Sequence, residues 1–491
     1  MSALLASALL TSLLSPANTV TSPPANAVTS PSTDAVTGAA GECSGVASDF
    51  DADGRPDTVV AAPYATVGGV FRAGEVTVRY GTGRTERLAQ GSRGAPGAAE
   101  TGDSFGSAVA AGDFDGDGCA DLAVGASEEF LDARRPGEDG DGVVYLFHGS
   151  PRGLRPGKAL DVTGFGRRAT GDRFGAALTV GQLDGDRADE LVIGVPGLGV
   201  GGGIGVYGVK GHRPYTLTKE TPWIAQDALS TDEFGATVAA GDFDGDGRDE
   251  VAVGAPGDGG QRSGAGSVTI LDLAARQAGA YTQESPNVKG SAEKWDYFGA
   301  ALAVGDFDAD GRDDLAIGVP GEDLDANVRA LDYGAGAVHV LYGSRRGLSA
   351  LGSEMWTQNT RGVVGRARYA DRFGTALAAG DFNGDGDDDL AIGVPGESAV
   401  QVLAGTRSGG LTRHHNVLIP RGRDGFGASL APVRRADGSP DDLLVGSPDH
   451  GTVVLIGGAA RKGSYPGLSA RRLRPHGSGP AGSLYGYALL P

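Results

Sequence analysis

The chain has 491 residues, of which 40% are apolar and 21% are charged, as is ordinary for a soluble globular protein. Its formal net charge of −20 argues against nucleic acid or an anionic membrane as a partner, because both are bound through basic patches. Glycine occurs 86 times, more than twice its usual share of ~7%, and this excess indicates many tight turns between short strands, as in an all-β protein.

The N-terminal residues 1–27 are expected to be a signal peptide. Residues 4–14 are an apolar core, and the small residues Ala25 and Ala27 suit a cleavage site. The segment lacks the basic residues that normally open a signal peptide, so a disordered leader is the alternative. Residues 28–40 have the Ser/Thr/Pro/Ala-rich composition of a linker. We therefore expect a secreted, extracellular protein, and no later run reaches the ~18 apolar residues of a membrane span.

An acidic segment then recurs along the chain, as in GDFDGDGCADLAVG from Gly112 to Gly125. Its four carboxylates fall within nine residues and repel one another. We number these loops from the first acidic residue, so that Asp113 is position one and Asp121 is position nine. Related segments begin at Ser48, Gly181, Gly241, Gly305 and Gly380, and a degenerate seventh copy begins at Val433.

Two further motifs recur at fixed offsets from the acidic segment. An aromatic-Gly pair precedes six of the copies by seven residues, beginning at Phe105, Phe174, Phe234, Phe298, Phe373 and Phe426. A Gly-Ala-Pro or Gly-Val-Pro triplet follows most copies, beginning at Gly194, Gly254, Gly318 and Gly393. Short apolar runs flank each loop, and two more strands follow. Four strands per ~60 residues, repeated seven times, predict a β-propeller.

The ends of the chain complement each other. The copy at Ser48 lacks an upstream aromatic-Gly pair, and Tyr485-Gly486 near the C-terminus has no acidic segment after it. We therefore expect an all-β, seven-bladed β-propeller over residues 41–491, in which the C-terminal strand completes the first blade.

This combination of motifs resembles the FG-GAP repeat of the integrin α-subunit N-terminal propeller, which also occurs in secreted bacterial proteins. The resemblance covers residues 41–491 and implies that the acidic loops bind calcium while the opposite face binds other proteins. The same repeats accompany a glycosylphosphatidylinositol-specific phospholipase D, but no catalytic domain is recognised beside the repeats in this sequence.

The acidic loops themselves have the pattern Asp-x-Asp-x-Asp-Gly, which begins calcium-binding loops. Alternate side chains converge on one point, and position seven can add its backbone carbonyl. Because a hard cation requires six to eight oxygen ligands, bound Ca²⁺ would turn the repulsion into attraction. Plain Asp-Gly hairpin turns are the alternative. We expect about five structural Ca²⁺ sites.

The expected ligands occupy positions one, three, five and nine of five loops. They are Asp49, Asp51, Asp53 and Asp57; Asp113, Asp115, Asp117 and Asp121; Asp242, Asp244, Asp246 and Glu250; Asp306, Asp308, Asp310 and Asp314; and Asp381, Asn383, Asp385 and Asp389. The position-seven carbonyls belong to Arg55, Cys119, Arg248, Arg312 and Asp387. In the third copy Gln182 replaces the first Asp, and Arg187 could place its cation beside Asp184 and Asp186, so we expect no metal there.

Catalytic motifs are weak. The G-x-S-x-G match at 102–106 overlaps an aromatic-Gly pair, where Ser104 leads into a strand rather than a nucleophile elbow. The cysteines, Cys43 and Cys119, form no C-x-x-C motif; a disulfide between them and two free thiols both remain open.

Three functions compete. The first is a secreted calcium-binding scaffold for adhesion to a protein or glycan ligand, with the connections 128–142 and 322–334 as ligand surface. The second is a secreted hydrolase or lyase acting on polysaccharide or phospholipid. The third is a lectin, although Trp223, Trp295 and Trp356 are expected in the core more than on a sugar-binding surface. We expect a monomer.

Overall fold

The computed structural model describes residues 43, 46, 48–92, 95–131, 140–324, 334–421, 425–435, 438–460, 466–469, 473–480 and 482–490. The expected signal peptide and linker lie outside these residues, as do 132–139 and 325–333 of the two connections expected to carry ligand surface.

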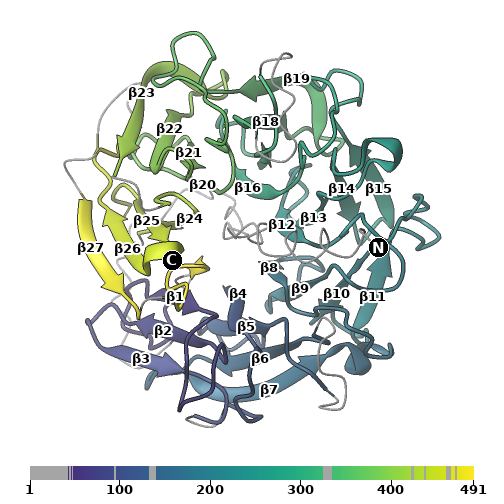
Figure 1. Cartoon of the computed structure of the whole chain (residues 1–491), viewed down its shortest axis with the longest axis vertical. Coiled ribbons are helices and arrows are strands. Elements are labelled where there is room, and N and C mark those ends of the chain that lie inside the picture. The colour runs from purple at the N-terminus through teal and green to yellow at the C-terminus, as the bar shows by residue number, and fades with distance from the viewer. Residues whose placement is uncertain are drawn as a thin grey trace, which may run out of the picture.

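Seven four-stranded antiparallel sheets are arranged as blades around a central axis (Figure 1). Blade 1 consists of β28 (Leu489–Leu490), β1 (Thr58–Ala62), β2 (Glu75–Arg79) and β3 (Thr85–Leu88). Blade 2 consists of β4 (Phe105–Gly112), β5 (Asp121–Ala126), β6 (Val143–His148) and β7 (Arg155–Asp161). Blade 3 consists of β8 (Ala177–Gly181), β9 (Glu190–Val195), β10 (Gly203–Tyr207) and β11 (Tyr215–Thr218).

The other four blades repeat this order. Blade 4 consists of β12 (Thr237–Gly241), β13 (Glu250–Ala255), β14 (Ser267–Asp272) and β15 (Gln277–Tyr281). Blade 5 consists of β16 (Ala301–Gly305), β17 (Asp314–Val319), β18 (Ala337–Tyr342) and β19 (Ser349–Trp356). Blade 6 consists of β20 (Leu377–Gly380), β21 (Asp389–Val394), β22 (Ala399–Ala404) and β23 (Thr412–Pro420). Blade 7 consists of β24 (Ser429–Val433), β25 (Asp442–Ser447), β26 (Thr452–Ile456) and β27 (Leu473–Ser478).

Burial decreases from the axis to the rim. Every residue of the second strands β5, β9, β13, β17, β21 and β25 is buried, which explains their continuous apolar sequence. The outermost strands alternate or face solvent, as in β7, which has no buried residue. The apolar clusters lie between neighbouring blades, so that each blade buries its faces against the next.

The aromatic-Gly and Gly-x-Pro motifs meet at the seams between blades. A Cβ added to Gly318 of blade 5 would clash with the backbone oxygen of Gly374 in blade 6. The Phe that precedes each paired glycine is fully buried, as Phe373 is here. The two motifs therefore recur together because a seam with a glycine on both sides, such as that of Gly318 and Gly374, brings two backbones into direct contact.

The predicted closure of the ring is confirmed. Strand β28 pairs antiparallel with β1, joining Leu490 to Val59 and Leu489 to Val60. Tyr485 and Leu489 belong to an apolar cluster that also contains residues of blade 7. In Figure 1 the C-terminus accordingly lies beside β1.

Helical structure in the described residues is limited to three short 3₁₀ turns, η1 (Val162–Phe165), η2 (Gly260–Arg262) and η3 (Pro448–His450). None of the helices in the described part of the chain has the length and apolar content to cross a membrane.

Candidate metal centres

The five loops with predicted ligands lie on one face of the propeller, which we call the loop face. In blades 2, 4, 5 and 6 the loop joins the innermost strand to the second strand, and in blade 1 it precedes the second strand, β1. Because all blades have the same strand order, these loops share one end of the molecule. The opposite end, which carries the connections from one blade to the next, is called the connection face.

The position-one carboxylate organises each loop through backbone amides. Asp113 Oδ1 accepts hydrogen bonds from the amides of Gly116 at 2.8 Å and Asp117 at 3.0 Å, and its Oδ2 accepts one from Gly118 at 2.8 Å. Asp242 and Asp381 accept the three equivalent bonds in their own loops. These hydrogen bonds fold the loop backbone around the position-one carboxylate without a contribution from a bound ion.

The position-nine carboxylate is held from two sides. Asp314 Oδ2 accepts the amide of Phe307 at 2.9 Å, and its Oδ1 accepts the amide of Gly343, just after β18, at 2.8 Å. The same glycine position donates to the ninth residue from Gly81, Gly149 and Gly405. Sequence reasoning missed this glycine because it lies one strand away from the loop.

Within the loops the carboxylates converge. One oxygen from each of Asp49, Asp51, Asp53 and Asp57 lies within 4.8 Å of the others, and the same holds for Asp113, Asp115 and Asp117. Several oxygens here are buried and have no hydrogen-bond partner in the described chain: Asp51 Oδ1, Asp53 Oδ2, Asp308 Oδ1, Asn383 Oδ1 and Asp389 Oδ2. Buried, unpaired oxygens that face other oxygens fit a hard divalent cation.

The charge of these loops is poorly compensated. Burial, and then the charges of Asp308 and Asp306, raise the pKa of Asp314 to about 9 although Gly343 donates to it. Burial likewise raises the pKa of Asp57 and of Glu250 to about 8. At neutral pH each of these sites therefore requires a proton or a cation to offset the repulsion.

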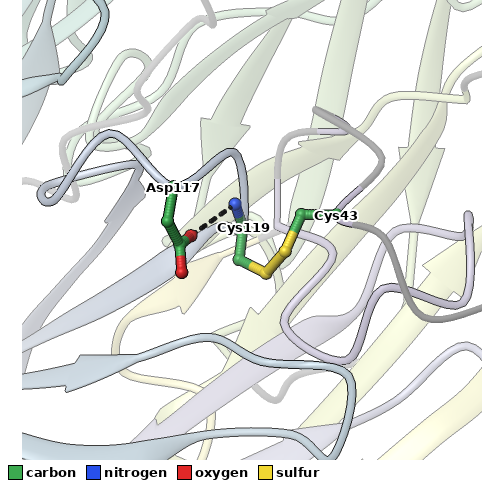
Figure 2. Close-up of side chains that lie close together, drawn as sticks. All are labelled: Cys43, Asp117 and Cys119. Carbon is green, nitrogen blue, oxygen red and sulfur yellow. Dashed lines mark hydrogen bonds between the residues drawn. A yellow bond between two sulfur atoms is a disulfide. The ribbon is translucent and has the colours of Figure 1, made fainter.

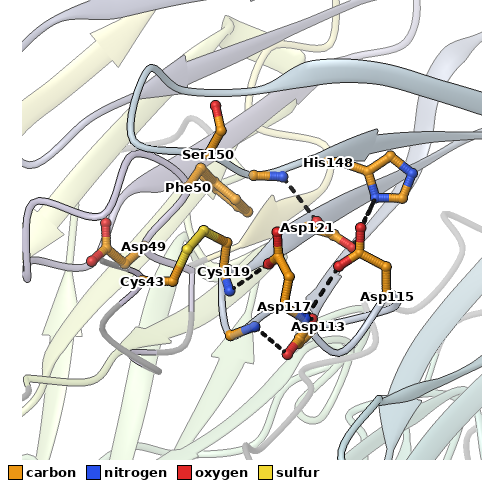
Figure 3. The surroundings of a disulfide bond; sticks show 12 residues. Cys43, Asp49, Phe50, Asp113, Asp115, Asp117, Cys119, Asp121, His148 and Ser150 are labelled. Atoms are coloured by element: carbon orange, nitrogen blue, oxygen red, sulfur yellow. Dashed lines mark hydrogen bonds and ion pairs between the residues drawn. A yellow bond between two sulfur atoms is a disulfide. The ribbon is translucent and has the colours of Figure 1, made fainter. Parts of the chain in front are cut away.

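His148, at the end of β6, is a functional candidate that sequence reasoning missed. Its Nδ1 lies 3.2 Å from both Asp115 Oδ2 and Asp121 Oδ2 (Figure 3). The only feature of the sequence that points to His148 is its position immediately before Gly149, whose amide donates to Asp121. His148 thus bridges positions three and nine of the blade 2 loop, and Asp115, Asp121 and His148 form a group that could hold a metal ion.

Two arginines expected to contribute only backbone carbonyls also use their side chains. Arg248 Nη2 lies 2.5 Å from Asp246 Oδ2, and Arg312 Nη1 lies 2.5 Å from Asp310 Oδ2. In both loops the guanidinium contacts position five from the solvent side, with side-chain exposures of 45% and 20%. These pairs neutralise part of the charge, while the other carboxylate oxygen of Asp246 and of Asp310 accepts the amide of Arg248 and of Arg312, each at 3.0 Å.

The third loop differs from the expectation in one residue. Lys210, after β10, places its ammonium 3.4 Å from Asp186, while Arg187 is exposed. The Gln182 side chain donates to Ala188 O at 3.0 Å and to Asp189 at 3.1 Å. Asp184, Asp186 and Glu190 still lie close together. The cation next to this loop is therefore Lys210 and not Arg187, which corrects the expectation for that residue.

Position eight forms a contact between blades that the sequence analysis did not anticipate. Asp313 Oδ2 accepts the amide of Asp242 in the preceding blade at 2.9 Å, while the amide of Asp313 donates to Asp242 O at 3.0 Å. The equivalent pairs are Asp189 with Asp113, Asp249 with Gln182, Asp388 with Asp306, and Asp441 with Asp381. In each pair the position-one residue of one blade is fixed by the next blade.

Cys43 and Cys119 form a disulfide, which settles the question that the sequence left open (Figure 2). It ties the segment before the blade 1 loop to position seven of the blade 2 loop, where Asp117 accepts the Cys119 amide at 2.9 Å. Position eight of that loop is Ala120, which has no carboxylate for the contact between blades. The disulfide thus supplies a covalent link at a seam that lacks the aspartate.

Comparison with known proteins identifies the repeats. The FG-GAP repeat family matches residues 105–147, 234–271, 298–341 and 373–410, and an FG-GAP-like repeat matches 49–124. These stretches include all five loops with predicted ligand sets.

Curated relatives include integrin alpha-PS2 of Drosophila melanogaster, 32% identical over 45% of this chain and 16% of that protein. Integrin alpha-IIb of Homo sapiens is 33% identical over 53% of this chain and 25% of that protein. The match spans about a quarter or less of these relatives' length.

Solved structures also match at low similarity. An exotype rhamnogalacturonan lyase is 16% identical over 83% of this chain and 70% of that chain, with a TM-score of 0.41. The periplasmic gluconolactonase of Pseudomonas aeruginosa is 13% identical over 86% of this chain and 99% of that chain, with a TM-score of 0.40. We draw no functional conclusion from scores this low. The chain thus carries FG-GAP repeats over the matched stretches and resembles the integrin alpha chains.

Proposed function

We propose that this protein is a secreted scaffold that binds calcium on its loop face and a protein or glycan ligand on its connection face. The observation that carries the calcium proposal is the convergence of buried, unpaired carboxylate and amide oxygens in the loops. Positions one, three, five and nine would supply side-chain oxygens, and position seven a carbonyl. A bound Ca²⁺ would supply the positive charge that the loops lack and would brace the hairpin of each blade.

The ligand proposal has two supports. The relatives with similar repeats are integrin alpha chains, which favours a protein ligand. Long connections on a rigid scaffold carry recognition. The connections 128–142 and 322–334 join the second strand to the third in blades 2 and 5, so their described ends lie at the same end of the blades as the connection face. Against a lectin, Trp356 lies in an apolar cluster and Trp223 packs against another. No feature of the described residues favours a hydrolase or lyase over this scaffold.

Calcium binding can be tested by thermal unfolding of the full chain in about 1–5 mM CaCl₂, which is at or above the dissociation constants of weak extracellular sites, roughly 10⁻⁴ to 10⁻³ M. We expect the melting temperature to fall by several degrees in EDTA and to return when calcium is restored. A transition that is the same in calcium and in EDTA would contradict the proposal.

The ligand and the export of the chain need separate tests. Protein and glycan arrays probed with the full chain in calcium should give specific protein or glycan signals, and arrays without signal would count against the scaffold. For export, the secreted chain should begin near Val28. Chain recovered from culture supernatant with Met1 intact would contradict cleavage.

A further inference from the structure

A second acidic pattern recurs on the connection face, away from the calcium loops. Between blades 4 and 5 it consists of Gln283, Asp296 and Glu322, which we call the Gln283 cluster. Gln283 Nε2 donates to Glu322 Oε2 at 2.6 Å. The three residues are 2%, 1% and 8% exposed, so the two carboxylates are almost completely removed from water.

No positively charged residue is among the groups that act most on the two carboxylates of the Gln283 cluster. Burial raises the pKa of Asp296 to about 8, and the neighbouring carboxylates of Glu322, Glu293 and Asp323 act in the same direction. Gln283 Oε1 is buried and has no hydrogen-bond partner in the described chain. A half-turn of the amide would exchange its nitrogen and oxygen and bring this oxygen to the carboxylate of Glu322.

In the preceding blade the position equivalent to Gln283 is occupied by a lysine, which balances the charge of the two carboxylates. There Lys219 replaces the glutamine, with the same spacing along the chain to Asp232 and Asp258. Its Nζ lies 2.9 Å from Asp232 Oδ2 and 2.7 Å from Asp258 Oδ2, and the side chain is 1% exposed. A buried cation bridges the two carboxylates.

The backbone around the two positions is the same. The amide of Gly257 donates to Asp232 O at 3.1 Å, and that of Gly321 donates to Asp296 O at 3.0 Å. Seven residues after Gln283 stands Gly290, where an added Cβ would lie 3.2 Å from Gln283 Nε2. The glycine thus keeps space open beside the amide.

We infer that the Gln283 cluster binds a divalent cation through oxygens of Asp296, Glu322 and Gln283, in the place that Lys219 fills in the preceding blade. Carboxylate and amide oxygens are ligands for a hard ion such as Ca²⁺, Mg²⁺ or Mn²⁺. This site is independent of the loop sites, since it lies at the other end of the blades.

The same pattern occurs twice more. Gln358 Nε2 donates to Glu397 Oε2 at 2.8 Å, and Gln358 Oε1 is again buried and unpaired. Here Arg368 lies 3.5 Å from Glu397 and supplies part of the positive charge, so we expect weaker binding. The third copy, at Gln90, also has an unpaired Oε1, and Gln90 Nε2 donates to Glu129.

The test replaces Gln283 with lysine, so that a side chain of the protein supplies the positive charge in place of the ion. We expect Gln283→Lys to bind one divalent ion fewer per chain than the wild type, measured by native mass spectrometry and by metal analysis after dialysis against CaCl₂ or MnCl₂. The variant should also melt at a higher temperature than the wild type in EDTA. Gln277→Lys, at an exposed position of β15, adds the same charge elsewhere and should change neither quantity.

Glu322→Gln is a second test of the same site, to be used if Gln283→Lys fails to fold. It replaces one of the two carboxylate ligands with a neutral amide. It should also lose one ion. Retention of the wild-type number of ions by either folded variant would overturn the inference and would indicate that the cluster holds a proton. Neither variant changes a loop residue, so ions bound in the loops remain in both variants. Absence of these loop ions from the wild type would refute the calcium proposal, whatever the result for the Gln283 cluster.

Discussion

At the residue scale, the proposed difference between loops that bind calcium and the third loop, which does not, depends on single side chains. Asp308 Oδ1 is buried and unpaired at position three of a loop with all four predicted ligands. In the third loop Gln182 bonds to its own loop and Lys210 contacts Asp186. Under the calcium proposal, the same loop backbone would hold an ion in one blade and has a lysine beside it in another.

Asp308→Ala should therefore remove one bound calcium per chain, because position three would lose both its oxygens. The melting temperature should fall in calcium and stay near that of the wild type in EDTA. Asp184→Ala, at position three of the third loop, is the matched control and should leave the ion count unchanged. An unaltered ion count for Asp308→Ala would show that this loop holds no ion.

A second residue-scale prediction concerns His339, which lies in β18 and is fully buried, with no hydrogen-bond partner for either ring nitrogen in the described chain. Burial, and then the charge of Lys289, lower its pKa from 6.5 to about 4. The folded state therefore favours the neutral ring. The stability this contributes is present above pH 6.5 and is lost as the pH falls toward 4, by up to ~3 kcal/mol.

His339→Phe should accordingly lose less stability than the wild type between pH 6.5 and 4.5 in urea unfolding. The exposed His414→Phe is the control and should follow the wild type. Parallel pH profiles for His339→Phe and the wild type would contradict this assignment, since the acidic loops titrate in both.

At the scale of the elements, the seams between blades depend on glycine. Gly318→Ala should destabilise the fold by about 1–3 kcal/mol, because the added methyl group would clash with Gly374 O and approach Ala301 Cβ to 2.9 Å. Gly279→Ala in β15 meets nothing within 4 Å and should change stability by less than ~0.5 kcal/mol. Equal free energies of unfolding for the two variants would show that the seam tolerates a side chain.

The sequence was most informative about the strands and loops and their order along the chain. Blade order, the position of each loop and ring closure by β28 followed from motif spacing, because each repeat has the same local pattern. Contacts between residues far apart in the sequence were not predictable: Asp313 bonds to Asp242 of the preceding blade, 71 residues earlier, and Gly343 reaches Asp314 from a different strand of the same blade. Lys210 took the role expected of Arg187 for the same reason, since it comes from the end of another strand.

At the scale of the whole molecule, the ring is held by contacts repeated at successive seams. Position-eight aspartates bond blades 3 to 7 to their predecessors, the disulfide links the entry of blade 1 to blade 2, and β28 closes blade 1. Each of these seams therefore has its own stabilising contact. Because every blade is joined to its neighbours, we expect the blades to unfold together.

Replacing both cysteines by serine should destabilise the ring by about 2–4 kcal/mol in urea unfolding, because a cross-link over 76 residues of chain would be lost. Non-reducing mass spectrometry of the wild type checks that the bond is present. A double variant as stable as the wild type would show that the seam between blades 1 and 2 does not need it.

The most direct test of the central claim is a crystal structure of the full chain grown in millimolar calcium. The account predicts ions in the loops of blades 1, 2, 4, 5 and 6, with oxygen ligands at about 2.3–2.6 Å, and none in the loop of blade 3. Loops without ions at that concentration, with Asp51, Asp308 and Asp389 turned to solvent, would contradict it.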